Sequence, residues 1–288
     1  MSAADDIRLQ LACAGLHPDR LRRLREEHGD AGALRRLVKG AVDGAERCGK
    51  EAAVDAAERR RLLAGLGITT VLRGAPGYPE RLADLPDAPD LLFVRGTIPD
   101  LPTVAVVGTR RCTAYGRALA REYGQVVAEA GWCLVSGLAR GIDGAAHEGT
   151  VTMGGAGVAV LGSGLDVLYP AEHRGLADDL VRSGGAVVSE YPPGTIPEPW
   201  RFPPRNRIIS GMADALVVVE AAVKGGALIT AGCALTHGRP VFAVPGDVRR
   251  ATSEGCNLLI RDGAHPVLGP EDLIDELTFV LGLPVPSH

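Results

Sequence analysis

The chain has 288 residues, of which 46% are hydrophobic and 23% are charged, and this balance excludes a largely disordered protein. The formal net charge of −4 comes from four acidic residues near the C-terminus, Glu271, Asp272, Asp275 and Glu276. In the rest of the chain, basic and acidic side chains balance. Overall charge therefore neither supports nor excludes a nucleic-acid partner.

No stretch of the sequence fits a signal peptide or a membrane span. Asp5 and Asp6 occupy the place of a basic n-region, and glycines interrupt the longest uncharged stretch, residues 149–165. The six cysteines are far apart and form no CxxC pair, so a zinc site is not expected. We expect a reduced, cytoplasmic protein with no metal, no cofactor and no membrane partner.

The first two segments of the chain differ from the rest. Residues 1–70 carry apolar side chains at helical spacing without strand alternation, which predicts a small all-helical N-terminal domain. Its basic runs, 20–25 and 58–63, could face DNA, although solvated helix faces are the commoner explanation. Residues 71–102 predict a Pro-rich connector with one short strand, 91–94.

From residue 103 onward, apolar strands and helix-length segments alternate. Each expected strand is a continuous, largely β-branched run, as in a strand covered on both faces. The expected strands are 104–108, 133–137, 157–162, 186–190, 215–220 and 240–244, and the expected helices are 114–130, 142–151, 171–183, 205–212 and 226–237. This order predicts an α/β domain over residues 103–282, built on a doubly wound parallel sheet.

Ligands of such sheets bind at the carboxyl ends of the strands, where helix N-termini present free N–H groups. Small and basic residues occupy these ends: Gly108, Thr109, Arg110, Arg111, Gly137, Gly141, Ser163, Gly225 and Gly226. They predict a broad crevice for phosphates, with the two arginines as forked donors. The dinucleotide pattern GxGxxG and the Walker pattern are both absent, which disfavours NAD and ATP chemistry.

The segment 192–207 combines prolines, aromatic residues and arginines after the fourth strand of this domain. We interpret Arg205, Asn206 and Arg207 as ligands of the bound phosphates. Trp200 and Phe202 fit either base stacking or anchoring of a rigid loop in the core.

Asp143 and His147 lie four residues apart and therefore share one helix face. An acid–base pair is one interpretation, but no nucleophile elbow accompanies it. We favour a structural brace of the site, with Asp143 as a helix N-cap and His147 as its hydrogen-bond partner.

Ordered motifs resemble the DprA/Smf family of DNA-processing proteins. They are GTRRCTAYG at 108–116, SGLARGIDGAAH at 136–147, LGSGLDVLYP at 161–170, SEYPPGTIPEPWRFPPRNRIISG at 189–211, KGGALITA at 224–231 and FAVPGDV…SEGCNLLIRDGA at 242–264. The resemblance implies a Rossmann-like domain that binds single-stranded DNA, forms a homodimer and helps load the RecA recombinase during DNA uptake and recombination (natural transformation), without catalysis.

The same resemblance assigns roles to individual residues. Arg110 corresponds to the family's phosphate-gripping arginine, Arg174 to the basic residue after its YP motif, and Thr230 belongs to its SLITA-like motif. Ala227 stands where the family usually has serine, which removes one hydroxyl. The family's C-terminal winged-helix domain has no counterpart expected here.

For the homodimer, we expect an exposed apolar patch from two segments: Ile208, Ile209, Met212, Leu258, Leu259 and Ile260.

Two alternatives to the DNA-binding function remain. One is a nucleotide phosphoribohydrolase of the LOG type, although Cys233 stands where its motif needs a glutamate. The other is a sensor domain for a small nucleotide signal.

Overall fold

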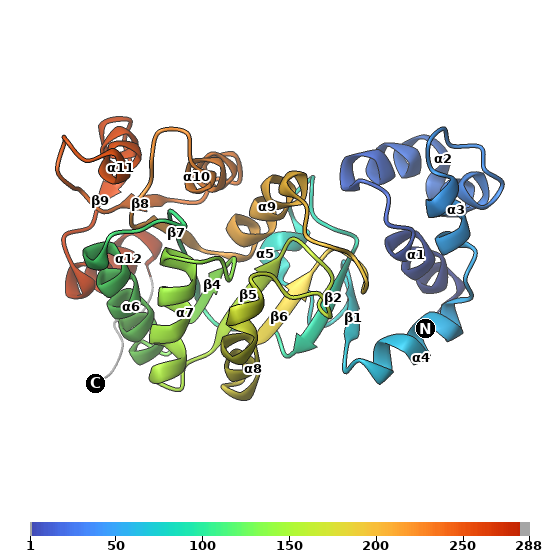
Figure 1. The fold of residues 1–288 in the computed structure, drawn as a ribbon, viewed down its shortest axis with the longest axis horizontal. Helices are drawn as coiled ribbons and strands as arrows, with labels where there is room; N and C mark the ends of the chain where they lie inside the picture. Colours follow the sequence, from blue (N-terminus) through green and yellow to red (C-terminus); the bar gives the residue numbers. More distant parts are fainter. Residues whose placement is uncertain (1, 283–288) are drawn as a thin grey trace.

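A mostly parallel sheet forms the centre of the chain, and the computed structural model describes residues 2–282 (Figure 1). In that range nine strands follow the order β1-β2-β6-β5-β4-β3-β7-β8-β9. Their bounds are β1 Thr69–Leu72, β2 Leu91–Gly96, β3 Thr103–Val107, β4 Cys133–Ser136, β5 Gly157–Leu161, β6 Ala186–Ser189, β7 Ala215–Val218, β8 Val241–Ala243 and β9 His265–Pro266. The strands from β3 to β9 pair in parallel, which confirms the doubly wound, Rossmann-like α/β domain.

The edge of the sheet differs from the sequence prediction. Strand β2 pairs antiparallel with β6, and β1 pairs antiparallel with β2, so the segment before residue 103 adds two strands rather than one. Strand β1 has no alternating pattern that could reveal it, because its residues are exposed or half-buried. The chain before the α/β alternation therefore extends the same sheet.

Twelve α-helices occupy the described chain: α1 Ala3–Cys13, α2 Pro18–Val38, α3 Glu46–Ala52, α4 Ala56–Gly65, α5 Glu80–Ala83, α6 Ala114–Glu129, α7 Ile142–Thr152, α8 Arg174–Arg182, α9 Phe202–Met212, α10 Gly226–Thr236, α11 Ala251–Arg261 and α12 Pro270–Leu281. Two short 3₁₀ turns precede α8 and α9, at Ala171–His173 and Pro199–Arg201. Helix α2 is kinked at Gly29, whose φ of 66° lies in the left-handed region that favours glycine.

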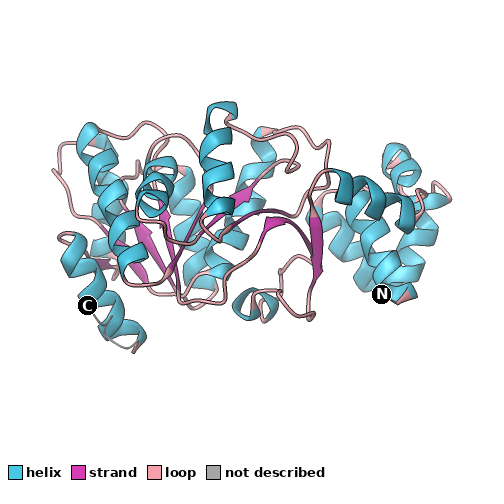
Figure 2. Cartoon of the chain, turned by 90° about the horizontal axis from the view of Figure 1, so that it is seen from below, coloured by secondary structure: helices cyan, strands magenta, loops and turns pink. Residues whose placement is uncertain are grey.

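Helices cover both faces of the sheet, as Figure 2 shows. Alternate residues along each strand point to opposite faces, so the core has two layers. One layer packs Val104 and Val106 of β3 against Tyr123 of α6 and Leu273 of α12. The other packs Ala105 and its neighbours against α9, α10 and α11. Both faces of the central strands are therefore buried.

The N-terminal helices α1 to α4 form a bundle with a small core of its own and also contact the sheet edge. Leu9 and Cys13 of α1 and Leu63 of α4 share one apolar cluster with Leu91 and Phe93 of β2. Figure 1 shows this bundle at the β1 end of the sheet, beyond the strands. Burial of aliphatic side chains thus holds the bundle against the sheet.

The expected exposed apolar patch is wrong for three of its residues. Ile208, Ile209 and Met212 are 1%, 1% and 5% exposed, because their face of α9 packs on the sheet.

Among the helices of the described residues, none has the length and apolar character that crossing a bilayer requires.

Candidate functional site

A crevice of about 400 Å³ lies at the carboxyl ends of β3 and β7. Residues from the loops after β3, β4 and β7 line it together with the first turns of α9 and α10. The predicted site residues that the structure brings together there are Gly108, Thr109, Arg110, Arg111, Asp143, Arg205, Asn206, Gly225, Gly226 and Thr230. A sheet of this topology places its ligand site at this edge.

Two glycines allow the close packing at the crevice. A Cβ on Gly108 would lie 2.8 Å from the Cβ of Ile142 and 2.9 Å from the carbonyl oxygen of Glu220. Gly141 has a φ of 84° and forms the N-cap of α7. Both positions therefore need glycine for steric reasons, and their role is to shape the site rather than to provide a side chain.

Arg110 and Arg111 are exposed at the crevice and have no carboxylate within 4 Å in the described chain. The Arg110 guanidinium carbon lies 4.7 Å from the ring centroid of Phe202. Phe202 in turn contacts Tyr169, with 5.8 Å between ring centroids. The stacked ring holds the Arg110 cation at the crevice without neutralising it.

The start of α10 presents backbone donors to the crevice. Gly225 is its N-cap and provides no side-chain hydrogen bond, and its carbonyl accepts the Leu228 N–H at 3.2 Å. The N–H groups of Gly226 and Ala227 therefore stay available for an anion. The Thr230 hydroxyl donates to the Gly226 carbonyl at 3.2 Å, and the Asn206 amide donates to the same oxygen at 3.3 Å. Asn206 and Thr230 thus stabilise the first turn of α10.

Arg205 lies beneath the crevice rather than on its surface, since it is only 4% exposed. Its guanidinium donates to the carbonyls of Gly137 and Val160, at the ends of β4 and β5, and its Nε donates to the side-chain oxygen of Asn206. Burial lowers the pKa of Arg205 to about 10, while the Asp143 carboxylate opposes the shift. The geometry makes Arg205 a brace of the strand ends.

Asp143 and His147 are not arranged as the sequence predicts. The N-cap of α7 is Gly141, and Asp143 lies buried in the first turn. Burial raises the pKa of the Asp143 carboxyl, against the Arg205 charge and the backbone amides of Ala139, Gly108 and Gly137. Neither ring nitrogen of His147 has a hydrogen-bond partner among the described residues, so the expected bond to Asp143 is absent.

The burial of His147 makes a prediction about acid stability. Burial lowers its pKa from 6.5 to about 3, and the charges of His173 and Arg205 act in the same direction. The unfolded chain therefore binds one more proton in this interval, and we expect His147 to cost stability as the pH falls from 6.5 toward 3, by up to about 1.4 kcal/mol per pH unit.

The difference between wild type and His147→Leu isolates this contribution. Urea unfolding at pH 7, 6, 5 and 4 should give a steeper loss of unfolding free energy for wild type than for the variant. Parallel curves for the two proteins would rule out this titration.

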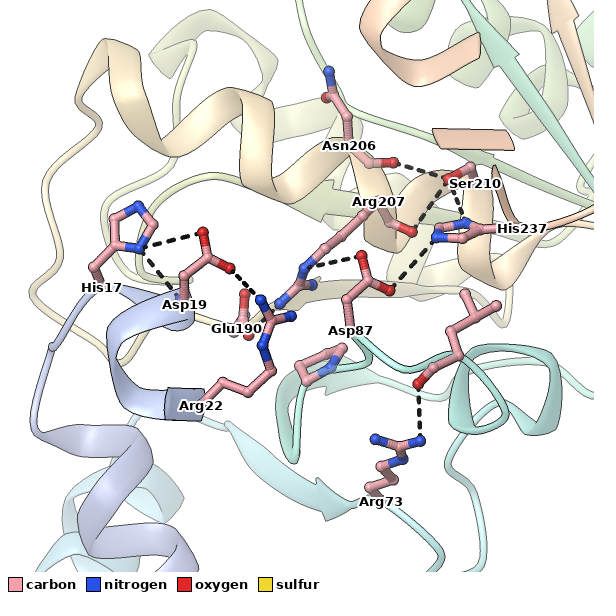
Figure 3. Close-up of polar contacts among 12 residues, drawn as sticks. His17, Asp19, Arg22, Arg73, Asp87, Glu190, Asn206, Arg207, Ser210 and His237 are labelled. Carbon is pink, nitrogen blue, oxygen red and sulfur yellow. Dashed lines mark hydrogen bonds and ion pairs between the residues drawn. The ribbon is translucent and has the colours of Figure 1, made fainter. Parts of the chain in front are cut away.

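Ser163, Arg174 and Arg207 are among the predicted residues that do not line the crevice. The Ser163 hydroxyl is buried and donates to the Val167 carbonyl at 2.8 Å, and Arg174 is exposed at the first residue of α8. Figure 3 shows that Arg207 points toward Glu190, whose Oε1 lies 2.6 Å from the Arg207 Nη2, and toward Asp87. Arg207 therefore belongs to an ion-pair network behind α9.

That network continues into α10. The His237 ring lies 3.5 Å from Asp87 through Nε2 and 3.0 Å from the Ser210 hydroxyl through Nδ1 (Figure 3). Burial lowers the pKa of His237, and the Asp87 carboxylate opposes this shift. The network joins α9 and α10 to the segment before β2, which stabilises the wall behind the crevice.

Two site residues escape the sequence prediction. Arg140 and Tyr169 line a small hollow beside the crevice together with Gly137, Arg110 and Phe202. The Arg140 guanidinium lies 5.8 Å from the Tyr169 ring centroid. The aromatic residue before Pro170, on the loop after β5, is the sequence signal that could have revealed this hollow.

The segment 192–201 links the crevice to the N-terminal helices. The Trp200 ring stacks on His17 with 5.0 Å between centroids, and the Arg201 guanidinium lies 4.2 Å from the Trp200 centroid. Trp200 is 40% exposed, so it does not anchor the loop in the core, and its ring contacts His17 and Arg201 at the surface instead.

A Rossmann-like domain with an open, basic crevice at its strand ends places the chain in the class of doubly wound α/β proteins, which hold their ligands at this edge of the sheet. Comparison with known proteins makes the assignment specific. The chain belongs to the family of DNA recombination-mediator protein A, whose family model matches residues 55–278, and the resemblance to DprA/Smf is thereby confirmed.

Several relatives give the extent of this similarity. Protein Smf of Escherichia coli is 45% identical over 206 residues, which are 71% of this chain and 55% of that protein. DNA processing protein DprA of Bacillus subtilis is 39% identical over 214 residues, or 73% of this chain and 72% of that protein. The chain thus spans little more than half the length of the Escherichia coli relative.

Two solved structures are similar over most of their length. The structure of DprA from Streptococcus pneumoniae has a TM-score of 0.76 at 34% identity and covers 93% of this chain and 95% of that one. DprA from Helicobacter pylori has a TM-score of 0.66 at 25% identity, covering 74% and 96%. The latter structure was described for its single-stranded DNA binding mode.

Proposed function

We propose that this protein binds single-stranded DNA without sequence preference, through the crevice at the ends of β3 and β7. The observation that carries the proposal is the exposed, unpaired Arg110 beside the free N-terminus of α10. Guanidinium and backbone N–H groups recognise phosphates and carry no direct information about bases. The described binding mode of the Helicobacter pylori relative supports the same ligand.

The proposal predicts a marked salt dependence. If about four phosphates are neutralised, the slope of log K against log salt should be near −3, at roughly 0.7 per phosphate of a single strand. Fluorescence anisotropy with a labelled oligo-dT, challenged by unlabelled duplex, measures both slope and preference. Equal affinity for duplex, or an affinity that salt leaves unchanged, would contradict the proposal.

We also propose that the protein works in the cytoplasm and helps RecA to form filaments during recombination and transformation. The family's description as a recombination mediator supports this role. The test follows ATP hydrolysis by RecA on a single strand covered with single-strand-binding protein. The chain should shorten the lag before hydrolysis, and an unchanged lag would argue against the role.

A homodimer is part of the proposal. Apolar side chains exposed on α10 and α12 contribute to the proposed interface, because Leu235 and Phe279 are 62% and 85% exposed. Light scattering should give twice the chain mass of 30.0 kDa. A monomer at tens of micromolar would exclude this assembly.

We propose that the site binds without catalysis. Asp143 lines the crevice but is 6% exposed, with its carboxyl facing backbone amides, and His147 is fully buried, which supports binding without acid–base catalysis. Release of a base from nucleoside monophosphates, lost on replacement of Asp143, would favour the phosphoribohydrolase alternative.

A further inference from the structure

Three loops at the carboxyl ends of β3, β7 and β8 lie side by side, because these strands are neighbours in the sheet. Backbone hydrogen bonds join the loops. The Thr109 N–H donates to the Glu220 carbonyl at 2.8 Å, and the Ala221 N–H donates to the Thr252 carbonyl at 2.8 Å. The loops therefore form one continuous rim that begins at the crevice and runs past it.

Cations that the crevice does not account for lie along this rim. Lys224 follows β7 and Arg249 follows β8, and both are exposed without a carboxylate within 4 Å in the described chain. Arg250 lies 3.9 Å from Asp247, whose carboxylate also accepts the Arg249 N–H, and Glu254 is exposed on α11. Together with Arg110 and Arg111, the rim carries an excess of positive charge.

The rim on the other side of the crevice is largely neutralised. There Arg140 forms an ion pair with Glu172, and the Arg201 guanidinium lies 2.8 Å from the carboxylate of Glu198. Arg174 also lies on that side; it is exposed and has no carboxylate within 4 Å in the described residues. A polyanion that leaves the crevice therefore meets more free positive charge over β7 and β8.

The two outer loops share a further feature. Val223 precedes Lys224 and Val248 precedes Arg249, and these valines are 46% and 80% exposed. An exposed aliphatic side chain beside a cation offers apolar contact to a base and charge to the adjacent phosphate. Neither group distinguishes one base from another, which agrees with binding that is independent of sequence.

We propose that a single strand of DNA bound in the crevice continues across Lys224 and Arg249, over the ends of β7 and β8. The inference rests on the proposed function and adds the direction of the strand. Neighbouring strands lie about 4.8 Å apart, so the rim from β3 to β8 spans about 10 Å.

The test compares two double variants that lose the same charge. Lys224→Ala/Arg249→Ala removes the rim over β7 and β8, and Arg140→Ala/Arg174→Ala removes the opposite rim. Each is titrated against labelled oligo-dT of 20 nucleotides over a range of salt. The first should bind about tenfold more weakly at 0.15 M salt, with a slope less negative by about 1.4, and the second should lose less.

The outcomes separate the two levels of the proposal. If wild type binds but the opposite-rim variant loses as much affinity as Lys224→Ala/Arg249→Ala, or more, the direction is wrong and the proposed function stands. If wild type binds no single strand, the proposed function fails, and the direction fails with it. The four side chains replaced in the two double variants are all exposed, so both variants should fold. Thermal unfolding of each variant checks this.

Discussion

Replacing Arg110 with alanine should weaken binding of single-stranded DNA by about 10- to 150-fold. Arg110 lines both the main crevice and the small hollow beside it, and the Phe202 ring holds its guanidinium in place. A charge-assisted hydrogen bond lost from such a site costs about 1.5–3 kcal/mol, and each 1.4 kcal/mol is a factor of ten in affinity. Titration of a labelled oligo-dT measures the loss.

Arg111→Ala is the matched control, because it removes the same charge from the neighbouring residue. Arg111 lines the crevice but stacks on no ring in the described structure, so its side chain must be ordered when a phosphate binds. That ordering has an entropic cost that Arg110 has largely met already, and Arg111→Ala should lose less affinity. Equal losses for the two variants would leave Arg110 no special role.

The sequence predicts a strand well when the residues of that strand alone determine its conformation. A strand buried on both faces, such as β3 or β7, appears as a continuous apolar run, and glycines at its end mark the turn to a helix. The parallel sheet and the edge that holds the crevice therefore followed from the sequence. Strand β1 did not, because its half-exposed residues depend on pairing with β2 for their conformation.

Side-chain roles were harder to predict than strands. Arg205 and Arg207 are two residues apart and look equivalent in the sequence, yet on α9 they point in different directions. Arg205 meets the carbonyls of Gly137 and Val160, and Arg207 meets Glu190. These partners are distant in sequence, so only the assembled fold decides that both cations are used internally.

Arg205→Ala should therefore act on stability, lowering the free energy of unfolding by about 3–5 kcal/mol. The substitution removes the donor shared by two buried carbonyls, and it removes the positive charge that favours the ionised form of the Asp143 carboxyl. Each buried carbonyl left without its donor costs about 1–3 kcal/mol, which accounts for most of the expected loss. Urea unfolding at pH 7, with the exposed Arg111→Ala as control, measures the difference.

A second substitution separates this explanation from loss of packing. Asp143→Asn in the Arg205→Ala background removes the stranded carboxylate, and it should recover part of the lost stability, because an uncharged amide has a smaller desolvation penalty. If Arg205 instead contacted phosphate from an exposed position, Arg205→Ala would weaken DNA binding while its unfolding curve overlaid that of wild type. The Arg205 guanidinium is buried under the ends of β4 and β5, so we expect the substitution to change stability more than DNA affinity. The protein that remains folded should bind DNA more weakly only to the extent that the residues at the base of the crevice shift.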